Sequence, residues 1–148
     1  MSAPSAEEVV RLLGLIPHPE GGFYKETFRP PGPNGGRGAS TAIYYLLRDH
    51  EASAWHRVRD ADEVWHHYAG ATLELTVVDG GRREVLRLGA DLLAGERPQA
   101  VVPAGAWQTA RIAGSAAGTW TLMGCTVAPA FEFASFEMAP AGWKPCGG

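Results

Sequence analysis

Residues 53–70 read SAWHRVRDADEVWHHYAG, a stretch rich in histidine, acidic and aromatic side chains. Two runs of apolar, aromatic and β-branched residues flank a short polar turn, which is typical of a β-hairpin. In such a hairpin the side chains of His56 and Glu63 can meet on one face. Side chains alternate along a strand, so Glu63, Trp65 and His67 share a face. We therefore expect His56 and Glu63 to form a pair, either in a pocket or on a solvated face of the hairpin.

The rest of the chain continues this pattern of short strands separated by turn residues. Residues 79–81 read DGG, a strong hairpin signal. One helix is expected over residues 6–13, because Ser5 and Glu8 form a capping box at its start. The expected strands cover residues 23–29, 41–47, 52–58, 63–69, 72–78, 83–88, 99–102, 107–112, 119–127 and 133–138.

Many short strands after one leading helix predict an all-β sandwich or barrel. The length of 148 residues fits one domain, so we expect a single domain over residues 1–148. We place its barrel at about residues 23–138 and a tail at about residues 140–148.

The composition argues against several classes of protein. Hydrophobic residues make up 45% of the chain and charged residues 20%, as in an ordinary globular protein. A formal net charge of −3 offers no basic surface to nucleic acid. No segment resembles a signal peptide or a membrane span. Cys125 and Cys146 do not suggest a disulfide framework, so we expect a cytoplasmic protein that binds neither nucleic acid nor a membrane.

The hairpin described above resembles the first motif of the cupin superfamily, His-x-His followed by Glu and then Gly. His56, Glu63 and Gly70 stand at the spacing of its first His, its Glu and its Gly. The second cupin motif, Pro-x-Gly-x-x-His, is matched by residues 103–108, where Gln108 takes the place of the His.

Three further segments make the chain similar to one particular cupin family that has no assigned biochemical role. They are HPEGGFY at residues 18–24, EVWH at residues 63–66 and GCTVAPAF at residues 124–131. The resemblance implies a double-stranded β-helix, the jelly roll of the cupins, and a homodimer. It also implies a small-molecule pocket inside the barrel, lined by His56, Glu63 and Gln108.

The resemblance raises the question of a metal, because many cupins hold a divalent ion with three His and one Glu. Val58 and Gln108 stand at two of the usual His positions. The remaining candidate metal ligands are His56, Glu63 and Gln108, with His67 as a substitute. A transition metal prefers three or more good ligands, so we expect no required cofactor and keep a divalent metal at these residues as an alternative.

The leading functional hypothesis is an isomerase or epimerase that acts without a redox cofactor. A His–carboxylate pair in a water-poor barrel can have pKa values suited to proton abstraction. The cupin superfamily includes metal-free nucleotide-sugar epimerases whose base is the His of the first motif, and His56 occupies that place. Those enzymes also use a Tyr from a late strand. No Tyr follows Tyr68 in this chain, so Tyr24 is expected to replace it beside the catalytic residues His56 and Glu63.

Further ligand contacts are expected from Gln108, Trp65, His67 and Glu26. In strand 23–29 we expect Tyr24 and Glu26 on one face, and Lys25, Thr27 and Arg29 on the other. The expected ligand is a small molecule such as a nucleotide sugar or another carbohydrate-like compound. Two alternatives stay open: an enzyme that depends on iron, manganese, nickel or zinc, and a binding protein without catalysis.

Overall fold

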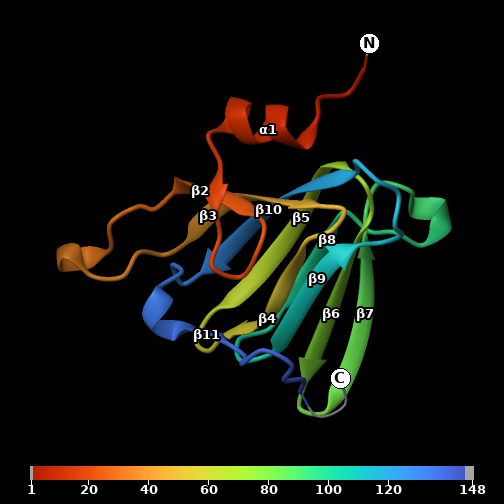
Figure 1. Ribbon diagram of the computed structural model, residues 1–148. Helices are drawn as coiled ribbons and strands as arrows, with labels where there is room; N and C mark the ends of the chain where they lie inside the picture. Colours follow the sequence, from red (N-terminus) through yellow and green to blue (C-terminus); the bar gives the residue numbers. More distant parts are fainter. Residues whose placement is uncertain (1, 146–148) are drawn as a thin grey trace.

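The structure is a computed structural model that describes residues 2–145 (Figure 1). Cys146 and the end of the expected tail, residues 146–148, lie outside the described residues. The elements are α1 (Ala6–Leu13), β1 (Ile16–Pro17), β2 (Phe23–Phe28), β3 (Thr41–Arg48), β4 (Ala52–Val58), β5 (Asp62–Gly70), β6 (Leu73–Asp79), β7 (Arg82–Leu88), β8 (Gln99–Val102), β9 (Trp107–Ile112), β10 (Trp120–Ala128) and β11 (Phe136–Met138), with short 3-10 turns at Pro33–Gly35, Leu92–Ala94 and Phe133–Ser135.

The strands form two sheets that face each other, which confirms the predicted all-β jelly roll (Figure 1). A six-stranded sheet has the order β1-β2-β3-β10-β5-β8, and a five-stranded sheet has the order β11-β4-β9-β6-β7. Neighbouring strands run antiparallel, so inward and outward side chains alternate on each of them. Tyr45, Leu47, Leu75 and Met123 are among the inward side chains that form the main core.

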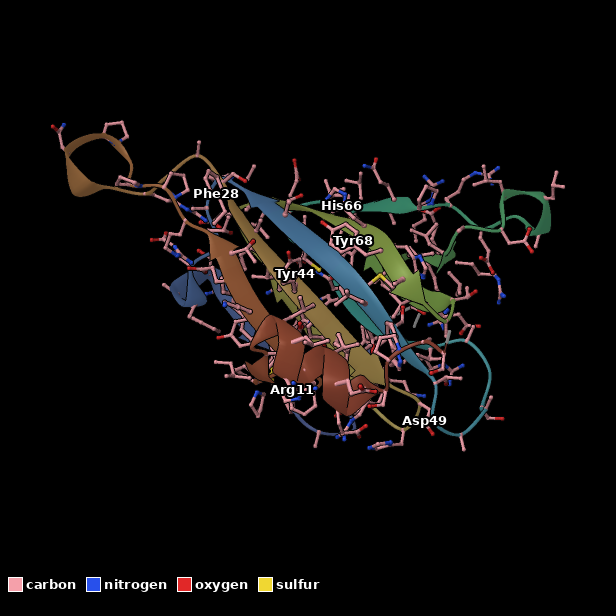
Figure 2. The ribbon with its side chains drawn as sticks, turned by 90° about the horizontal axis from the view of Figure 1, so that it is seen from above. Arg11, Phe28, Tyr44, Asp49, His66 and Tyr68 are labelled. Atoms are coloured by element: carbon pink, nitrogen blue, oxygen red, sulfur yellow. The ribbon has the colours of Figure 1, made fainter. Side chains whose placement is uncertain are left out.

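Helix α1 lies on the outer face of the six-stranded sheet (Figure 2). The predicted capping box is confirmed: the Ser5 side chain accepts from the Glu8 backbone N–H, and Glu8 accepts from that of Ser5. Ala6 and Val9 are buried in a second cluster together with Leu46 of β3. No helix within residues 2–145 is both long and apolar enough to cross a membrane.

The hairpin at residues 79–81 is also confirmed. Strands β6 and β7 pair up to Asp79 and Arg82, so Gly80 and Gly81 form a two-residue turn between them. Both glycines have positive φ, 58° and 84°, as a type I′ turn requires.

The expected strand at residues 133–138 is only half right. Phe133–Ser135 is a 3-10 turn and the strand is confined to β11. Phe133 and Phe136 both line one cavity. Side chains three residues apart point to opposite faces of a strand but to the same side of a 3-10 turn, which explains the interruption.

Candidate functional site

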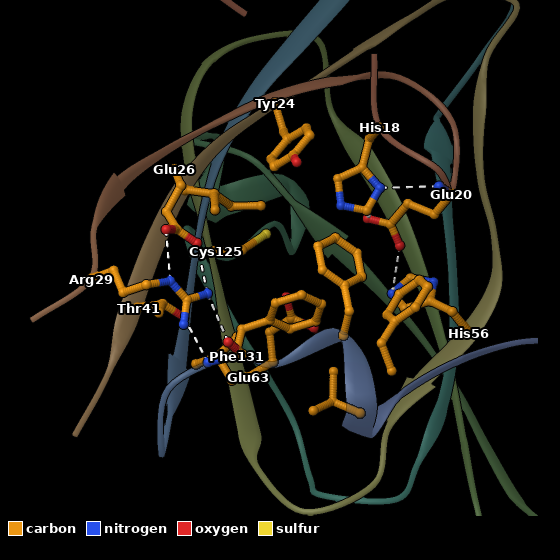
Figure 3. Close-up of a pocket in the computed structure, with 15 residues that line it drawn as sticks. His18, Glu20, Tyr24, Glu26, Arg29, Thr41, His56, Glu63, Cys125 and Phe131 are labelled. Carbon is orange, nitrogen blue, oxygen red and sulfur yellow. Dashed lines mark hydrogen bonds and ion pairs between the residues drawn. The ribbon is translucent and has the colours of Figure 1, made fainter. Parts of the chain in front are cut away.

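A cavity of about 310 Å³ lies between the two sheets (Figure 3). Strands of both sheets and three loops contribute to its wall. Two carboxyl groups and one imidazole of its wall are buried: Glu20 is 7% exposed, His56 2% and Glu63 8%. Charges withdrawn from water to this extent must find partners or change their protonation state.

The loop at residues 18–22, between β1 and β2, brings Glu20 into the barrel. The backbone N–H of Ala54 in β4 donates to the carbonyl of Glu20 at 2.8 Å. Gly21 has a φ of 108°, and a Cβ at this position would lie 2.3 Å from the carbonyl oxygen of Ala52. Only glycine fits this close approach between loop and strand, so the HPEGG segment has a structural role in placing Glu20.

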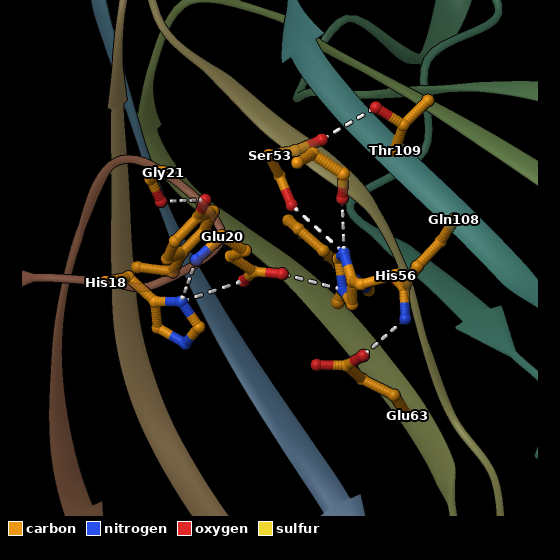
Figure 4. A network of polar contacts seen from close by, with 11 residues as sticks. His18, Glu20, Gly21, Ser53, His56, Glu63, Gln108 and Thr109 are labelled. Carbon is orange, nitrogen blue, oxygen red and sulfur yellow. Dashed lines mark hydrogen bonds and ion pairs between the residues drawn. The ribbon is translucent and has the colours of Figure 1, made fainter. Parts of the chain in front are cut away.

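Glu20 and His56 form a buried ion pair (Figure 4). Oε2 of Glu20 lies 2.8 Å from Nε2 of His56, although no aligned hydrogen bond satisfies this oxygen. Nδ1 of His56 lies 2.7 Å from the carbonyl oxygen of Ala54. A carbonyl can only accept, so Nδ1 carries a proton, and Nε2 faces a carboxylate. Both ring nitrogens thus face acceptors, which favours the imidazolium form of His56.

The electrostatics of the cavity agree with this geometry. Burial alone would lower the pKa of His56, but the charge of Glu20 outweighs it and raises the pKa to about 9. Burial opposes ionisation of Glu20, yet the charge of His56 outweighs burial and holds the pKa of Glu20 below its usual value. Near neutral pH the pair is therefore a carboxylate facing an imidazolium.

His18 behaves differently from His56. Burial lowers the pKa of His18 despite the nearby Glu20 carboxylate, so its ring is neutral near pH 7. Nδ1 of His18 accepts from the backbone N–H of Glu20 at 3.0 Å. A neutral ring has one donor and one acceptor nitrogen, which leaves Nε2 to carry the proton.

Glu63 is the third buried group. Burial raises the pKa of Glu63 to about 7, against the opposing charge of His56. Its Oε1 accepts from Nε2 of Gln108 at 2.7 Å, and Oε1 of Gln108 accepts from the indole N–H of Trp65 at 2.9 Å. An indole nitrogen can only donate, so the Trp65 contact fixes the Gln108 amide with its NH₂ toward Glu63. Oε2 of Glu63 receives no hydrogen bond from nitrogen or oxygen donors among residues 2–145, and the buried Cys125 thiol lies beside the carboxyl.

Tyr24, Glu26 and Arg29 line another part of the wall (Figure 3). The guanidinium of Arg29 donates to both carboxylate oxygens of Glu26, at 2.8 and 2.9 Å, and to the carbonyl of Phe131 at 2.8 Å. The expectation that Glu26 and Arg29 lie on opposite faces is wrong. The pairing of β2 with β3 shifts register between Glu26 and Phe28, and this irregularity turns Arg29 to the side of Glu26.

Apolar side chains complete the cavity. The rings of Phe131, Phe133 and Phe136 pack edge to face, with centroids 4.9 to 5.9 Å apart. Ile43 and Val127 lie on the same wall. The cavity therefore combines an aromatic surface with a cluster of buried polar groups.

Four of the predicted site residues line this cavity, and three do not. His56, Glu63, Tyr24 and Glu26 are lining residues. Gln108 and Trp65 lie behind Glu63 and contact it only through the hydrogen bonds described above. His67 lies outside the lining, with Nε2 3.1 Å from the carbonyl oxygen of Ala71.

The predicted pairing of His56 with Glu63 is replaced by another pairing. Glu20 is the ion-pair partner of His56, and Glu63 acts on it only through its charge. The sequence reasoning missed Glu20, His18 and the cavity contact of Arg29. The segment at residues 18–24 carries part of the family similarity, and its His18 and Glu20, one residue apart, are the signal in the sequence for this part of the site.

The residues at the usual cupin metal positions do not fit a metal ion. Val58 offers no donor atom, the Gln108 amide directs its NH₂ toward Glu63, and both nitrogens of His56 face acceptors. Within residues 2–145 no group of three or more His, Cys, Asp or Glu side chains is arranged to hold a metal ion. The donor set therefore suits a bound proton better than a divalent cation.

Comparison with known proteins gives a consistent family and fold. A family model described as "Cupin superfamily (DUF985)" matches residues 7–139, and no curated protein matches the chain. A protein from Shewanella oneidensis of known structure is 35% identical over 93% of this chain and 85% of its own, with a TM-score of 0.85. A hypothetical protein from Leishmania major is 32% identical over 92% and 88%, with a TM-score of 0.81. A dTDP sugar isomerase from Desulfovibrio desulfuricans shares the fold alone, at 14% identity over 82% and 83% and a TM-score of 0.60.

Proposed function

The chain belongs to this cupin family, and we propose that its barrel binds a small molecule and moves a proton on it, as an isomerase or epimerase does. One observation carries the proposal: Glu20, His56 and Glu63 are buried together in one cavity, where the pKa of His56 is raised to about 9 and that of Glu63 to about 7. Such groups cluster at catalytic sites, where proton transfer requires them. The fold alone would not support this function.

Glu63 is the proposed proton acceptor. A general base works best when its pKa lies near the operating pH, and the pKa of Glu63 is about 7. Its free Oε2 takes a proton from the carbon next to a carbonyl group of the ligand. The C–H bond breaks, an O–H bond forms on Glu63, and the electron pair moves into an enolate. Returning the proton to the other face of the same carbon completes an epimerisation. Returning it to the former carbonyl carbon completes an isomerisation, provided that the hydroxyl proton of the neighbouring carbon passes to the former carbonyl oxygen. Neither reaction involves net oxidation.

His56 and Tyr24 are proposed to stabilise the enolate oxygen. The imidazolium of His56 supplies a positive charge in a water-poor cavity, where charge stabilisation is strongest. The Tyr24 hydroxyl lies on the cavity wall and can donate its proton to that oxygen. A carbohydrate with a carbonyl group, free or within a nucleotide sugar, has a hydrogen of the required acidity.

The experiment is hydrogen exchange in deuterated water. The protein is incubated with aldoses and ketoses, and loss of the proton next to the carbonyl is followed by NMR. We expect exchange with the natural protein and its loss in Glu63→Gln. Glu84→Gln, a matched change at an exposed position of β7, should leave the exchange unaltered. Sugars that bind without exchange would refute catalysis and leave a binding protein.

A further inference from the structure

We infer that the cavity takes an uncharged, hydroxyl-bearing ligand and excludes anions, because Glu26 occupies the guanidinium of Arg29. This inference rests on the proposed function, since it names the ligand class of the same site. It also narrows the carbohydrate-like ligand, because the phosphates of a nucleotide sugar would find the bidentate edge of Arg29 already taken by Glu26.

The first argument is the occupancy of the two cationic side chains that line the cavity. Arg29 uses three of its N–H groups on Glu26 and on the carbonyl of Phe131. A bidentate contact of this kind is the geometry by which arginine binds phosphate or carboxylate ligands, and Glu26 already fills it. His56 faces Glu20 and the carbonyl of Ala54. An anionic ligand would have to displace one of these carboxylates.

The second argument is the acceptor and the donor that the wall offers to a ligand. Glu63 keeps Oε2 without a nitrogen or oxygen donor, whereas Oε2 of Glu20 is buried and faces the His56 imidazolium. The free oxygen of Glu63 calls for a donor from a ligand, and a hydroxyl group provides it. Nε2 of His18, which lines the same cavity, is a matching neutral donor. One acceptor on Glu63 and one donor on His18 suit a ligand with hydroxyl groups, and the carboxyl groups repel a phosphate.

The third argument is the volume of the cavity and the apolar part of its wall. A cavity of about 310 Å³ lies at the small end of the range for ligand sites, roughly 300–1,000 Å³. A single sugar ring suits such a volume. The rings of Phe131, Phe133 and Phe136 give the C–H face of a sugar an apolar surface while Glu63 and His18 take its hydroxyls.

The test compares matched ligands by calorimetry. Glucose, fructose and ribose are each titrated beside their phosphate esters. We expect at least one free sugar to bind about tenfold or more tighter than its phosphate ester, a difference of about 1.4 kcal/mol. Equal or tighter binding of a phosphate ester would overturn the inference, as would the failure of every free sugar to bind at millimolar concentration.

A variant pair makes the role of Glu26 explicit. Glu26→Gln frees the guanidinium of Arg29 and should tighten binding of the phosphate ester about tenfold or more. Asp60→Asn breaks a similar bidentate pair with Arg37 that does not line the cavity, so it should change neither the affinity for the free sugar nor the affinity for its phosphate ester. Arg29→Gln removes the cation and should not improve phosphate binding. Unchanged phosphate affinity in folded Glu26→Gln would contradict the proposed role.

The outcomes separate this inference from the proposed function. A preference for free sugars without any hydrogen exchange would support the ligand class and refute the catalysis. Exchange that occurs only with phosphate esters would support the catalysis and refute the ligand class.

Discussion

Replacement of Glu20 by Gln should change the pH dependence of stability in a way set by His56. The pKa of His56 is raised from 6.5 to about 9 in the folded protein, mainly by the Glu20 carboxylate acting against burial. A folded state that binds a proton more tightly than the unfolded chain is most stable below the unfolded pKa. The free energy of unfolding is therefore expected to fall as the pH rises from 6.5 toward 9.

The size of this effect follows from the two pKa values. Each pH unit between them corresponds to about 1.4 kcal/mol, so the interval from 6.5 to about 9 is worth roughly 3 kcal/mol. Glu63 also loses its folded-state proton as the pH rises, but within the interval from 4.5 to about 7. Above pH 7 the decline therefore belongs mainly to His56.

In Glu20→Gln the charge that supports the imidazolium is gone. The charge of Glu63 and the contact with the Ala54 carbonyl remain, but they oppose burial without the largest stabilising charge, so the pKa of His56 should fall. The decline in stability between about pH 7 and 9 should therefore be shallower in the variant than in the natural protein.

The assay is urea unfolding at several pH values between about 6 and 9, with nitrogen chemical shifts of His56 as a direct measure of its protonation. Glu51→Gln is the matched control. It removes a carboxylate that pairs with Arg48 at 3.0 Å, and a guanidinium does not titrate in this range. This control should shift the stability without altering its slope. An equal slope in the natural protein and in Glu20→Gln would refute the assignment of the ion pair.

Three further changes test the parts around this pair. Gly21→Ala places a Cβ 2.3 Å from a backbone oxygen at a φ of 108°, so it should cost about 1–3 kcal/mol of stability in urea unfolding and lower the pKa of His56 measured by NMR. The control Gly95→Ala, which also has positive φ but lies in open space, should cost less stability and leave the pKa of His56 unchanged. Gln108→Leu removes a hydrogen bond that lowers the pKa of Glu63. The pKa of Glu63 should then rise above about 7 in a carbon-13 titration of the carboxyl group, and the variant should lose about 1–3 kcal/mol of stability. The double variant Val58→His with Gln108→His should bind one zinc ion per chain in equilibrium dialysis, whereas the natural protein should not. Equal zinc binding by the double variant and the natural protein would contradict the conclusion that the natural residues do not fit a metal ion.

The strands could be predicted because their signals are local. Alternation of apolar side chains, the DGG turn at residues 79–81 and the capping box at Ser5 each depend on neighbours in the sequence, and each appears in the structure. The interruption at residues 133–135 could not be predicted in this way. It arises because two phenylalanines must reach the same cavity, which is a property of the packed barrel.

The candidate site was predicted in part for the same reason. His56 and Glu63 lie on adjacent strands of one hairpin, so their common orientation follows from spacing. Glu20 comes from a distant loop, and its contact with His56 depends on the bend at Gly21 and on a backbone bond to β4. The turn that brings Arg29 beside Glu26 depends on a register shift that no alternation rule contains.

The absence of His side chains at two of the usual cupin metal positions and the presence of Glu20 both disfavour a metal ion in the cavity. A metal ion needs a neutral His56 with a free nitrogen, whereas the carboxylate of Glu20 stabilises the protonated ring. With Val58 and Gln108 at the other positions, a divalent cation would gain too few ligands to displace that proton. The buried positive charge of the cavity is therefore carried by an imidazolium. Such a charge can be given up as a proton, which a metal ion cannot do, and this difference supports the acid–base chemistry that we propose for the cavity.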